Sequence, residues 1–388
     1  MSNYCIVSEF NPLHYGHAYL FEQARAHGAE TVTCVMSGNS TQRGELAIVD
    51  KYERARAAIE CGADLVLELP FPWCSASAEY FANAAVYVAS FFGDTLFFGS
   101  ECSDVEFLYD AAKYCTTEEF TAEYDLSLRN GEGSANAFIE CLSKKGFSNV
   151  FSNDLLGISY IKSIISNGYS LVPITTQRVG AGYNDTQSYS DRFSSATAIR
   201  TLIEQGCYDE LSSLVPPPMA RILINEIENG RVTVLSEADS AILSYFRLSS
   251  PEELDGVADT SGGIANRLIN VSRQSVSAAD MIDRLKTKRY TDAKMRRAML
   301  YCLTKTPQEC IRALPAYTTL LGANEKGRAL LSKNKKQNGI CVVTKSADAP
   351  RDTEQYALSE KLDMLFGVAR KNKLTVESFF QKNAYIVK

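Results

Sequence analysis

Four short apolar runs recur along the first hundred residues, and amphipathic segments separate them. The runs cover residues 4–7, 31–36, 64–69 and 94–99, and the segments between them, about 16–27, 50–61 and 76–91, have helical spacing. Continuous apolar runs of this length are typical of strands buried on both faces of a parallel sheet. Asp50 and Gly62 suit the N-cap and C′ positions of the second helix. The alternation predicts an α/β fold with a doubly wound parallel sheet, which binds ligands at the carboxyl ends of its strands.

The pattern changes after residue 104. Residues 104–150 have helical patterns and are expected to form an insertion; a helix at 155–166 and a strand at 169–176 follow. A glycine-rich loop at 178–185 precedes "SSATAIR" (194–200), which opens a helix with Ser194 as its expected N-cap. Three successive prolines at 216–218 mark a boundary between residues 1–215 and 216–388. The second part is predicted to be mainly helical to about residue 320, with a late apolar run at 339–344.

Length and composition are those of a globular protein. The chain has 388 residues, enough for two domains, with 45% hydrophobic and 22% charged residues. Its net charge of −6 means that a nucleic-acid partner would need a local basic patch. The 11 cysteines are scattered singly without a CxxC pair, which favours a reduced, cytoplasmic protein. No signal peptide is seen, and no apolar run reaches the roughly 18 residues of a membrane span.

Two of the three histidines, His14 and His17, lie in "NPLHYGH", directly after the first strand. Gly16 between them lets a ligand approach the backbone, and the helix N-terminus that follows suits an anion. Imidazole N–H groups there can donate to phosphate oxygens and stabilise the charge that develops on a phosphorus under attack. The alternative is that one histidine only caps the helix while the other is packed. The position of the pair after strand one favours a phosphate site.

The HxGH turn together with "SSATAIR" resembles the nucleotidyltransferase superfamily that also contains class I aminoacyl-tRNA synthetases. Several further segments are similar to bacterial tRNA(Met) cytidine acetate ligase: residues 36–70, "FFGSE" (97–101), "SNDLLG" (152–157), "RVGAGYND" (178–185) and "KTKRYTDAKMRRAMLYCL" (286–303). These motifs span most of the chain in the family's order. The sequence departs from the family pattern at Leu13, at Ser40–Thr41 and at Asn184.

The resemblance implies a Rossmann-like nucleotidyltransferase domain that binds ATP, followed by a mainly helical C-terminal domain that binds tRNA. It implies that ATP activates acetate as acetyl-adenylate, and that the acetyl group is then transferred to N4 of the wobble cytidine of elongator tRNA(Met). It assigns catalysis to His14, His17 and Arg200. The ATP-binding residues that it implies are Val7, Ser8, Glu9, Phe10, Asn11, Pro12, Leu13, His14, Tyr15, Gly16, His17, Ala18, Tyr19, Leu20, Gly99, Asn153, Arg178, Ser195 and Thr197. Outside the resemblance, Gly99 also suits a turn and Asn153 a helix cap.

No paired-carboxylate motif predicts a metal site of the chain's own. Asp50, Asp64 and Glu68 are candidate Mg²⁺ ligands by residue type, but they do not form such a motif. Magnesium is therefore expected to arrive with ATP and to keep most of its water.

One segment reverses the acidic charge of the chain. Its basic and aromatic residues are Lys286, Lys288, Arg289, Tyr290, Lys294, Arg296 and Arg297. A phosphate backbone needs such a surface, and Tyr290 suits stacking on an unpaired base. We therefore predict that this segment contacts tRNA; the alternative is a solvated helix face.

Two other functions remain open from the residues alone. An adenylyl- or cytidylyltransferase acting on a phosphorylated small molecule would explain the HxGH turn and "SSATAIR", but not the basic segment. A catalytically weak nucleotide- and RNA-binding adaptor is the other alternative, and Asn184 keeps it open. The sequence leaves the oligomeric state undetermined.

Overall fold

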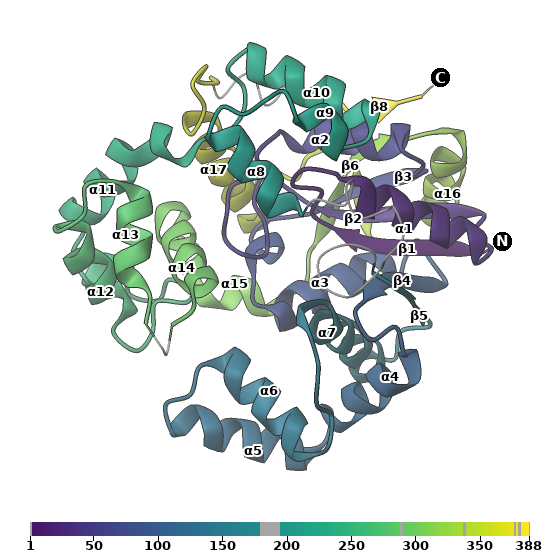
Figure 1. The fold of residues 1–388 in the computed structure, drawn as a ribbon, viewed down its shortest axis with the longest axis horizontal. Coiled ribbons are helices and arrows are strands. Elements are labelled where there is room, and N and C mark those ends of the chain that lie inside the picture. Colours follow the sequence, from purple (N-terminus) through teal and green to yellow (C-terminus); the bar gives the residue numbers. More distant parts are fainter. Residues whose placement is uncertain are drawn as a thin grey trace.

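The centre of the fold is a mostly parallel sheet with helices on both faces (Figure 1). The computed structural model describes residues 2–178, 195–287, 290–336, 339–375, 378 and 382–387. The strands are β1 (Asn3–Ser8), β2 (Thr31–Ser37), β3 (Leu65–Leu69), β4 (Thr95–Ser100), β5 (Val172–Gln177), β6 (Tyr317–Ala323), β7 (Cys341–Val343) and β8 (Tyr385–Ile386). Their order in the sheet is β5-β4-β1-β2-β3-β6-β7, and β8 pairs with β6.

The strand order reverses beside β1. The chain builds from β1 through β2 to β3 on one side, then returns to place β4 and β5 on the other side, all in parallel. This confirms the predicted doubly wound sheet. Such a reversal leaves a crevice at the carboxyl ends of β1 and β4, which is where open α/β sheets bind ligands.

Helices α1 (Tyr15–Ala26) and α2 (Lys51–Glu60) cover one face of the sheet, and α3 (Ala78–Ala89) and α7 (Ser152–Asn167) cover the other. Successive strand residues alternate between the two cores: Cys5 packs on the α3 side and Ile6 on the α1 side. At the start of α2, Asp50 accepts a hydrogen bond from the backbone N–H of Tyr52 at 2.9 Å. The helix is followed by Gly62 at φ +121°, so both predicted ends are confirmed.

Three helices fall within the segment 104–150. They are α4 (Val105–Tyr114), α5 (Glu118–Arg129) and α6 (Ser134–Lys144). Asp104 and Thr117 cap the first two, by accepting from the backbone N–H of Phe107 at 3.0 Å and of Phe120 at 3.2 Å. Helix α4 packs on α7, whereas α5 and α6 form a hairpin at the lower edge of the view in Figure 1.

The rest of the described chain is mainly helical. Its helices are α8 (Ala196–Glu204), α9 (Leu211–Leu214), α10 (Pro217–Glu228), α11 (Asp239–Leu248), α12 (Ile264–Ser272), α13 (Ala278–Leu285), α14 (Asp292–Thr304), α15 (Gln308–Arg312), α16 (Glu325–Lys336) and α17 (Glu354–Val368). Short 3-10 turns lie at η1 (Trp73–Ser75), η2 (Leu235–Ala238), η3 (Glu252–Leu254) and η4 (Ser346–Asp348).

Strand β6 differs from the sequence-based prediction, which continued the helical pattern to about residue 320. A short apolar run such as "YTTLLGA" has no period that distinguishes a buried strand from a helix. β6 pairs antiparallel with β3, so the sheet itself includes residues from both sides of position 215/216. The division into two domains at that position stays a prediction.

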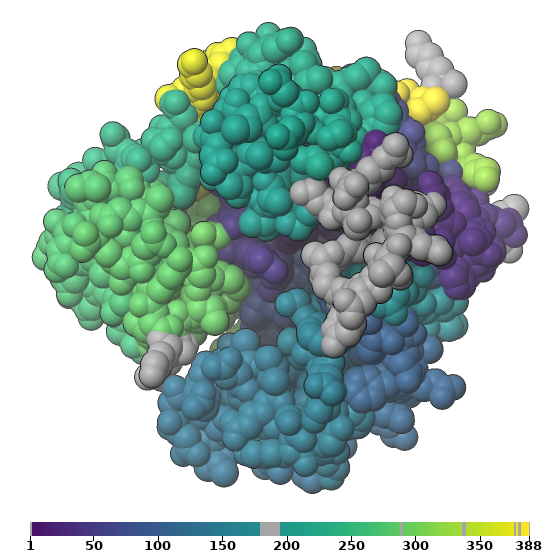
Figure 2. All heavy atoms as spheres, viewed as in Figure 1, coloured from purple at the N-terminus to yellow at the C-terminus, as the bar shows by residue number. Residues whose placement is uncertain are grey.

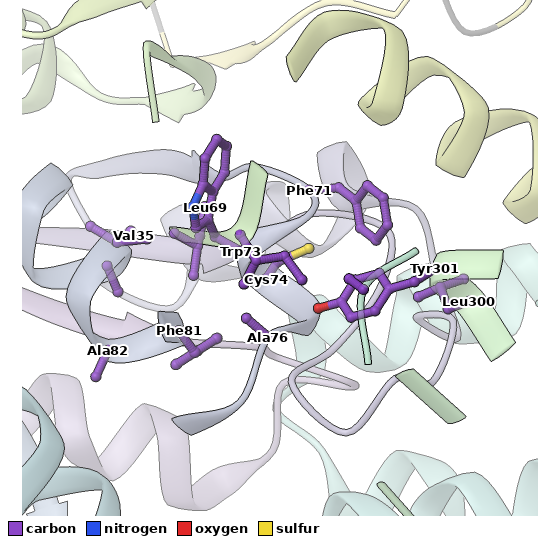
Figure 3. Close-up of a cluster of buried hydrophobic side chains, with 14 of the residues drawn as sticks. Val35, Leu69, Phe71, Trp73, Cys74, Ala76, Phe81, Ala82, Leu300 and Tyr301 are labelled. Carbon is purple, nitrogen blue, oxygen red and sulfur yellow. The ribbon is translucent and has the colours of Figure 1, made fainter. Parts of the chain in front are cut away.

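A shared core joins α14 to the sheet (Figure 3). Tyr301 of α14 is fully buried, with its ring 5.9 Å from that of Phe71. Its hydroxyl donates to the backbone oxygen of Ser75 at 2.7 Å, and the indole N–H of Trp73 donates to the backbone oxygen of Ala313 at 2.7 Å. Burying an aromatic side chain of this kind contributes about 1.5–3 kcal/mol. Helix α14 is therefore held at a fixed place relative to the strand ends.

Candidate active site

The loop after β1 lies at the reversal point of the sheet and leads directly into α1. His14 is the N-cap residue of α1, and its Nδ1 accepts from the backbone N–H of Gly16 at 3.1 Å. In return, Nδ1 of His17 accepts from the backbone N–H of His14 at 3.2 Å. The two rings stack with centroids 3.9 Å apart. The pair thus forms a reciprocal capping box in which imidazoles replace the usual hydroxyl and carboxylate.

The hydrogen bonds assign the tautomers of both rings. Because each Nδ1 accepts, the proton of each neutral ring is placed on Nε2. Burial and the nearby charge of Arg178 lower the pKa of His14 to about 4. Burial, then His14 and Arg178, lower the pKa of His17 well below its ordinary value. At pH 7 each ring is therefore neutral: one nitrogen caps the helix, and the other carries an N–H donor.

Arg178 follows β5 and supplies positive charge beside the two histidines. Its Nη1 donates to Oδ1 of Asn153 at 2.9 Å, and the amide of Asn153 donates to Glu101. Glu101 also accepts from the backbone N–H of Asn153 at 3.1 Å. A Cβ on Gly99 would lie 2.9 Å from Cγ of Arg178, so a side chain there would displace the arginine. Gly99, Asn153 and Arg178, predicted from distant parts of the sequence, therefore form one cluster.

Helix α8 brings Arg200 into contact with the loop after β1. Nη1 of Arg200 donates to the backbone oxygen of Asn11 at 2.9 Å, and Nη2 contacts Glu45 at 2.9 Å and Oγ1 of Thr197 at 3.3 Å. Ser195 is the N-cap of α8 and accepts from the backbone N–H of Ala198 at 3.2 Å. The cap lies one residue later than expected, and Ser194 lies outside the described residues. The loop after β1 therefore carries two neutral imidazole donors, with the charge of Arg178 near them and Arg200 bound to the loop backbone at Asn11. Such a set of donors and positive charges suits a polyphosphate.

A family model described as HIGH Nucleotidyl Transferase matches residues 1–379. The chain belongs to this family. Among its relatives, the tRNA(Met) cytidine acetate ligase of Caldicellulosiruptor bescii is 36% identical over 338 residues, 85% of this chain and 84% of that protein. The enzyme of the same name from Listeria monocytogenes is 35% identical over 377 residues, 92% of this chain and 95% of that protein.

Solved structures give the same result. The crystal structure of Thermotoga maritima TmcAL bound with alpha-thio ATP has a TM-score of 0.89 and 30% identity, and covers 100% of both chains. The apo form of that protein has the same TM-score with 32% identity and the same coverage. The T. maritima relative in sequence, a tRNA(Met) cytidine acetate ligase, is 34% identical over 385 residues, 92% of each chain. The resemblance and the Rossmann-like fold class are confirmed.

In this HIGH nucleotidyltransferase chain, the stretch from Val7 to Leu20 contains side chains of the hydrophobic core as well as the predicted ATP contacts. Phe10 and Leu13 are 1% and 0% exposed, and the ring of Phe10 meets that of His17 edge-on at 5.0 Å. Phe10 therefore supports His17 from the core. Because the side chains of Phe10 and Leu13 are buried, only the backbone atoms of these two residues are left for the predicted contact with ATP. Ser8 Oγ and Asn11 Nδ2 are buried without a hydrogen-bond partner among the described residues. Such groups point to a polar ligand or water in the site.

The predicted tRNA segment is only partly a free basic surface. Lys288 and Arg289 lie outside the described residues. Arg297 is 7% exposed and pairs with Asp259 at 3.2 Å, so it is tied into the protein. The four remaining members are more exposed than Arg297 or contact one another. Lys286 pairs with Asp283 at 2.7 Å with 47% of its side chain exposed, and Arg296 pairs with Glu45 and Asp292 with 26% exposed. The ammonium of Lys294 lies 5.4 Å from the Tyr290 ring centre.

Two acidic residues at the site were not predicted. Glu101 ends the "FFGSE" motif and supports Asn153, and Glu45 lies in "GEL" and contacts Arg200. The position of Glu101 directly after a strand was a usable signal. No pattern in the sequence indicated that Glu45 contacts α8, because that contact spans 155 positions.

Within the described ranges, no group of three or more His, Cys, Asp or Glu side chains gathers as a metal site. Among the described helices, none combines the length and the apolar character that a membrane-spanning segment requires.

Proposed function

We propose that the chain is an ATP-dependent ligase that activates acetate as acetyl-adenylate and acetylates N4 of the wobble cytidine of elongator tRNA(Met). The observation that carries the proposal is the stacked pair His14 and His17, whose Nδ1 atoms both accept from the backbone at the start of α1 and leave Nε2–H as the donor. The charge of Arg178 lies near this pair, and Arg200 contacts the backbone of the same loop at Asn11. The names of the relatives support the choice of acetate and tRNA(Met). The TmcAL crystal structure with alpha-thio ATP supports ATP as the nucleotide.

In the first step, a carboxylate oxygen of acetate attacks the α-phosphorus of ATP, the bond to the bridging oxygen breaks, and pyrophosphate leaves. Acetate is already ionised at pH 7, so this step needs no general base. It needs donors that hold the triphosphate and stabilise the charge of the transition state. His14 and His17 supply neutral donors at the helix N-terminus, while Arg178 and Arg200 supply charge.

In the second step, the exocyclic amine N4 of the cytidine attacks the acetyl carbon. The acyl–phosphate bond breaks, AMP leaves with the bonding electron pair, and the amine loses one proton. The proposed tRNA contact lies in residues 216–388, the proposed tRNA-binding domain. Among the described residues it includes Lys286, Tyr290, Lys294 and Arg296, whereas Arg297 is buried against Asp259. Ser195 and Thr197 complete the triphosphate side on α8.

Magnesium is proposed to enter with ATP, held by the phosphates and water rather than by a carboxylate cage of the chain. A cytoplasmic location follows from the proposed substrates, since ATP and tRNA are present there.

Labelled acetate tests the whole reaction. Incubation with ATP and elongator tRNA(Met) should place the label in tRNA and release one AMP and one pyrophosphate per acetyl group. A transcript with uridine in place of the wobble cytidine is the control and should stay unlabelled. Label in the uridine transcript would contradict the proposed acceptor, and consumption of ATP without acetate would contradict the proposed nucleophile.

A further inference from the structure

The carboxylate of Glu45 contacts two arginines that come from different parts of the molecule. Its Oε2 accepts from Nη2 of Arg200 on α8 at 2.9 Å, and its Oε1 accepts from Nη1 of Arg296 on α14. The side chain of Glu45 is 24% exposed and those of the arginines are 17% and 26% exposed, so all three are partly shielded from water. Figure 2 shows a hollow between the green lobe that contains α14 and the teal helices above, with purple atoms of the first sixty residues at its floor.

The loop that carries Glu45 is fixed on several sides. Arg54 is 0% exposed and donates to the backbone oxygens of the loop at Gly38 and Val49. The backbone N–H of Gln42 donates to Oε1 of Glu9, directly after β1, at 2.7 Å. Gly44 has φ +74°, and a Cβ there would lie 2.5 Å from the backbone nitrogen of Arg297. The loop therefore rests directly on the start of α14 and cannot shift without moving that helix.

This fixed acceptor limits where Arg200 can point. An arginine has five N–H donors. Arg200 uses its donors to contact Asn11, Glu45 and Thr197, and these contacts hold its guanidinium against the loop after β1. The contact with Asn11 lies three residues before His14. A long side chain in contact with a rigid carboxylate loses less conformational entropy when a ligand binds, which is the basis of preorganisation.

We propose that Glu45 is a positioning residue: it holds the Arg200 guanidinium in the orientation that meets the triphosphate, and Arg296 on α14 holds Glu45 in turn. The inference rests on the proposed function, because it assumes that Arg200 contacts ATP. It goes further by assigning a role to an acidic residue that would repel the phosphates if it faced them directly. It also makes α14, part of the proposed tRNA-binding domain, a support of the nucleotide site.

A double-mutant cycle tests this role. The variants are Glu45→Gln, which removes the charge at constant size, Glu45→Asp, which keeps the charge, Arg200→Ala, and Glu45→Gln combined with Arg200→Ala. Glu79→Gln is the matched control, because Glu79 pairs with Lys162 at 2.8 Å on the surface, with 62% of its side chain exposed. The measurements are kcat and KM for ATP in acetate-dependent pyrophosphate exchange, equilibrium binding of ATP, and the thermal unfolding midpoint.

Glu45→Gln should lower kcat/KM for ATP by about 10–100-fold, by analogy with the loss seen when the outer-shell partner that orients a metal ligand is removed. Glu45→Asp should recover part of that loss, and Glu79→Gln should behave as the parent protein. On the Arg200→Ala background, Glu45→Gln should change kcat/KM by less than about twofold, because a residue that acts through another has nothing left to position.

Equal losses from Glu45→Gln in both backgrounds would overturn the proposal, as would tighter ATP binding by Glu45→Gln, which would make Glu45 a competitor of the phosphates. If the parent protein shows no acetate-dependent exchange, the proposed function fails. ATP binding by the same variants then still decides the role of Glu45.

Discussion

Replacing His14 by asparagine and His17 by glutamine separates the two tasks that each imidazole performs. Alanine removes both the helix cap and the Nε2–H donor, so its effect on rate cannot be divided between them. Asparagine is a favoured N-cap residue, and its side-chain oxygen can accept from the start of α1 as Nδ1 of His14 does. Glutamine is the usual partner at the third position of a capping box, where His17 stands.

The expected magnitudes follow from these contacts. Loss of a preorganised donor to a developing charge lowers the rate by about 10²–10³, which equals about 2.7–4 kcal/mol of transition-state stabilisation. Loss of an N-cap costs about 0.5–2 kcal/mol of folding stability. His14→Asn and His17→Gln should therefore lose about 10²–10³ in the rate of acetate-dependent pyrophosphate exchange, with a nearly unchanged unfolding midpoint. His14→Ala should lose the same rate and also unfold more easily.

The assay measures exchange at saturating acetate, together with urea unfolding of each variant under the same buffer conditions. Exchange by His14→Asn and His17→Gln within about threefold of the parent rate would refute the donor role and leave the histidines as helix caps. A low rate in His14→Asn that comes with the stability loss of His14→Ala would show that asparagine failed to cap. In that case the His17→Gln variant decides the question.

Three further predictions follow from the same contacts. The fold lowers the pKa of His14 to about 4, so the unfolded chain binds more protons than the folded chain between about pH 6.5 and pH 4. Urea unfolding should therefore show that the free energy of unfolding falls as the pH drops through that window, and this fall should be less steep in His14→Asn. Arg178→Ala and Arg200→Ala should each weaken ATP use, measured by exchange kinetics, more than tRNA binding, measured by filter retention; the opposite order would place the arginine on the tRNA side. Charge reversal at Lys286 and Lys294 should lower tRNA affinity and flatten its salt dependence while sparing acetate-dependent exchange, and an unchanged salt slope would contradict a phosphate contact there.

The parts of the fold that the sequence predicts well are those determined by local pattern. The strand before "NPLHYGH" is a continuous apolar run, and the helix that begins after Asp50 has a cap and a terminating glycine. These signals act over a few residues, so the strand, the turn and the helix could be placed without knowing the rest of the chain.

The parts that sequence reasoning missed depend on long-range contacts. β6 is a strand because β3 offers it an edge, and the two are more than 240 positions apart. Arg297 belongs by pattern to a basic surface, yet the packing of α14 on the sheet turns it inward to Asp259. Glu45 becomes part of the site only because α8 and α14 both reach its loop. Pairings of this kind are set by tertiary packing, which a single sequence does not display.

The most direct test of the account is the exchange of labelled pyrophosphate into ATP by the purified protein, with and without acetate and in the absence of tRNA. The account predicts exchange that depends on acetate, because acetyl-adenylate forms reversibly at the site of His14, His17, Arg178 and Arg200 before any tRNA is needed. Exchange that instead requires a phosphorylated small molecule would make the protein a nucleotidyltransferase of a different substrate class. No exchange under any of these conditions would contradict acetate activation.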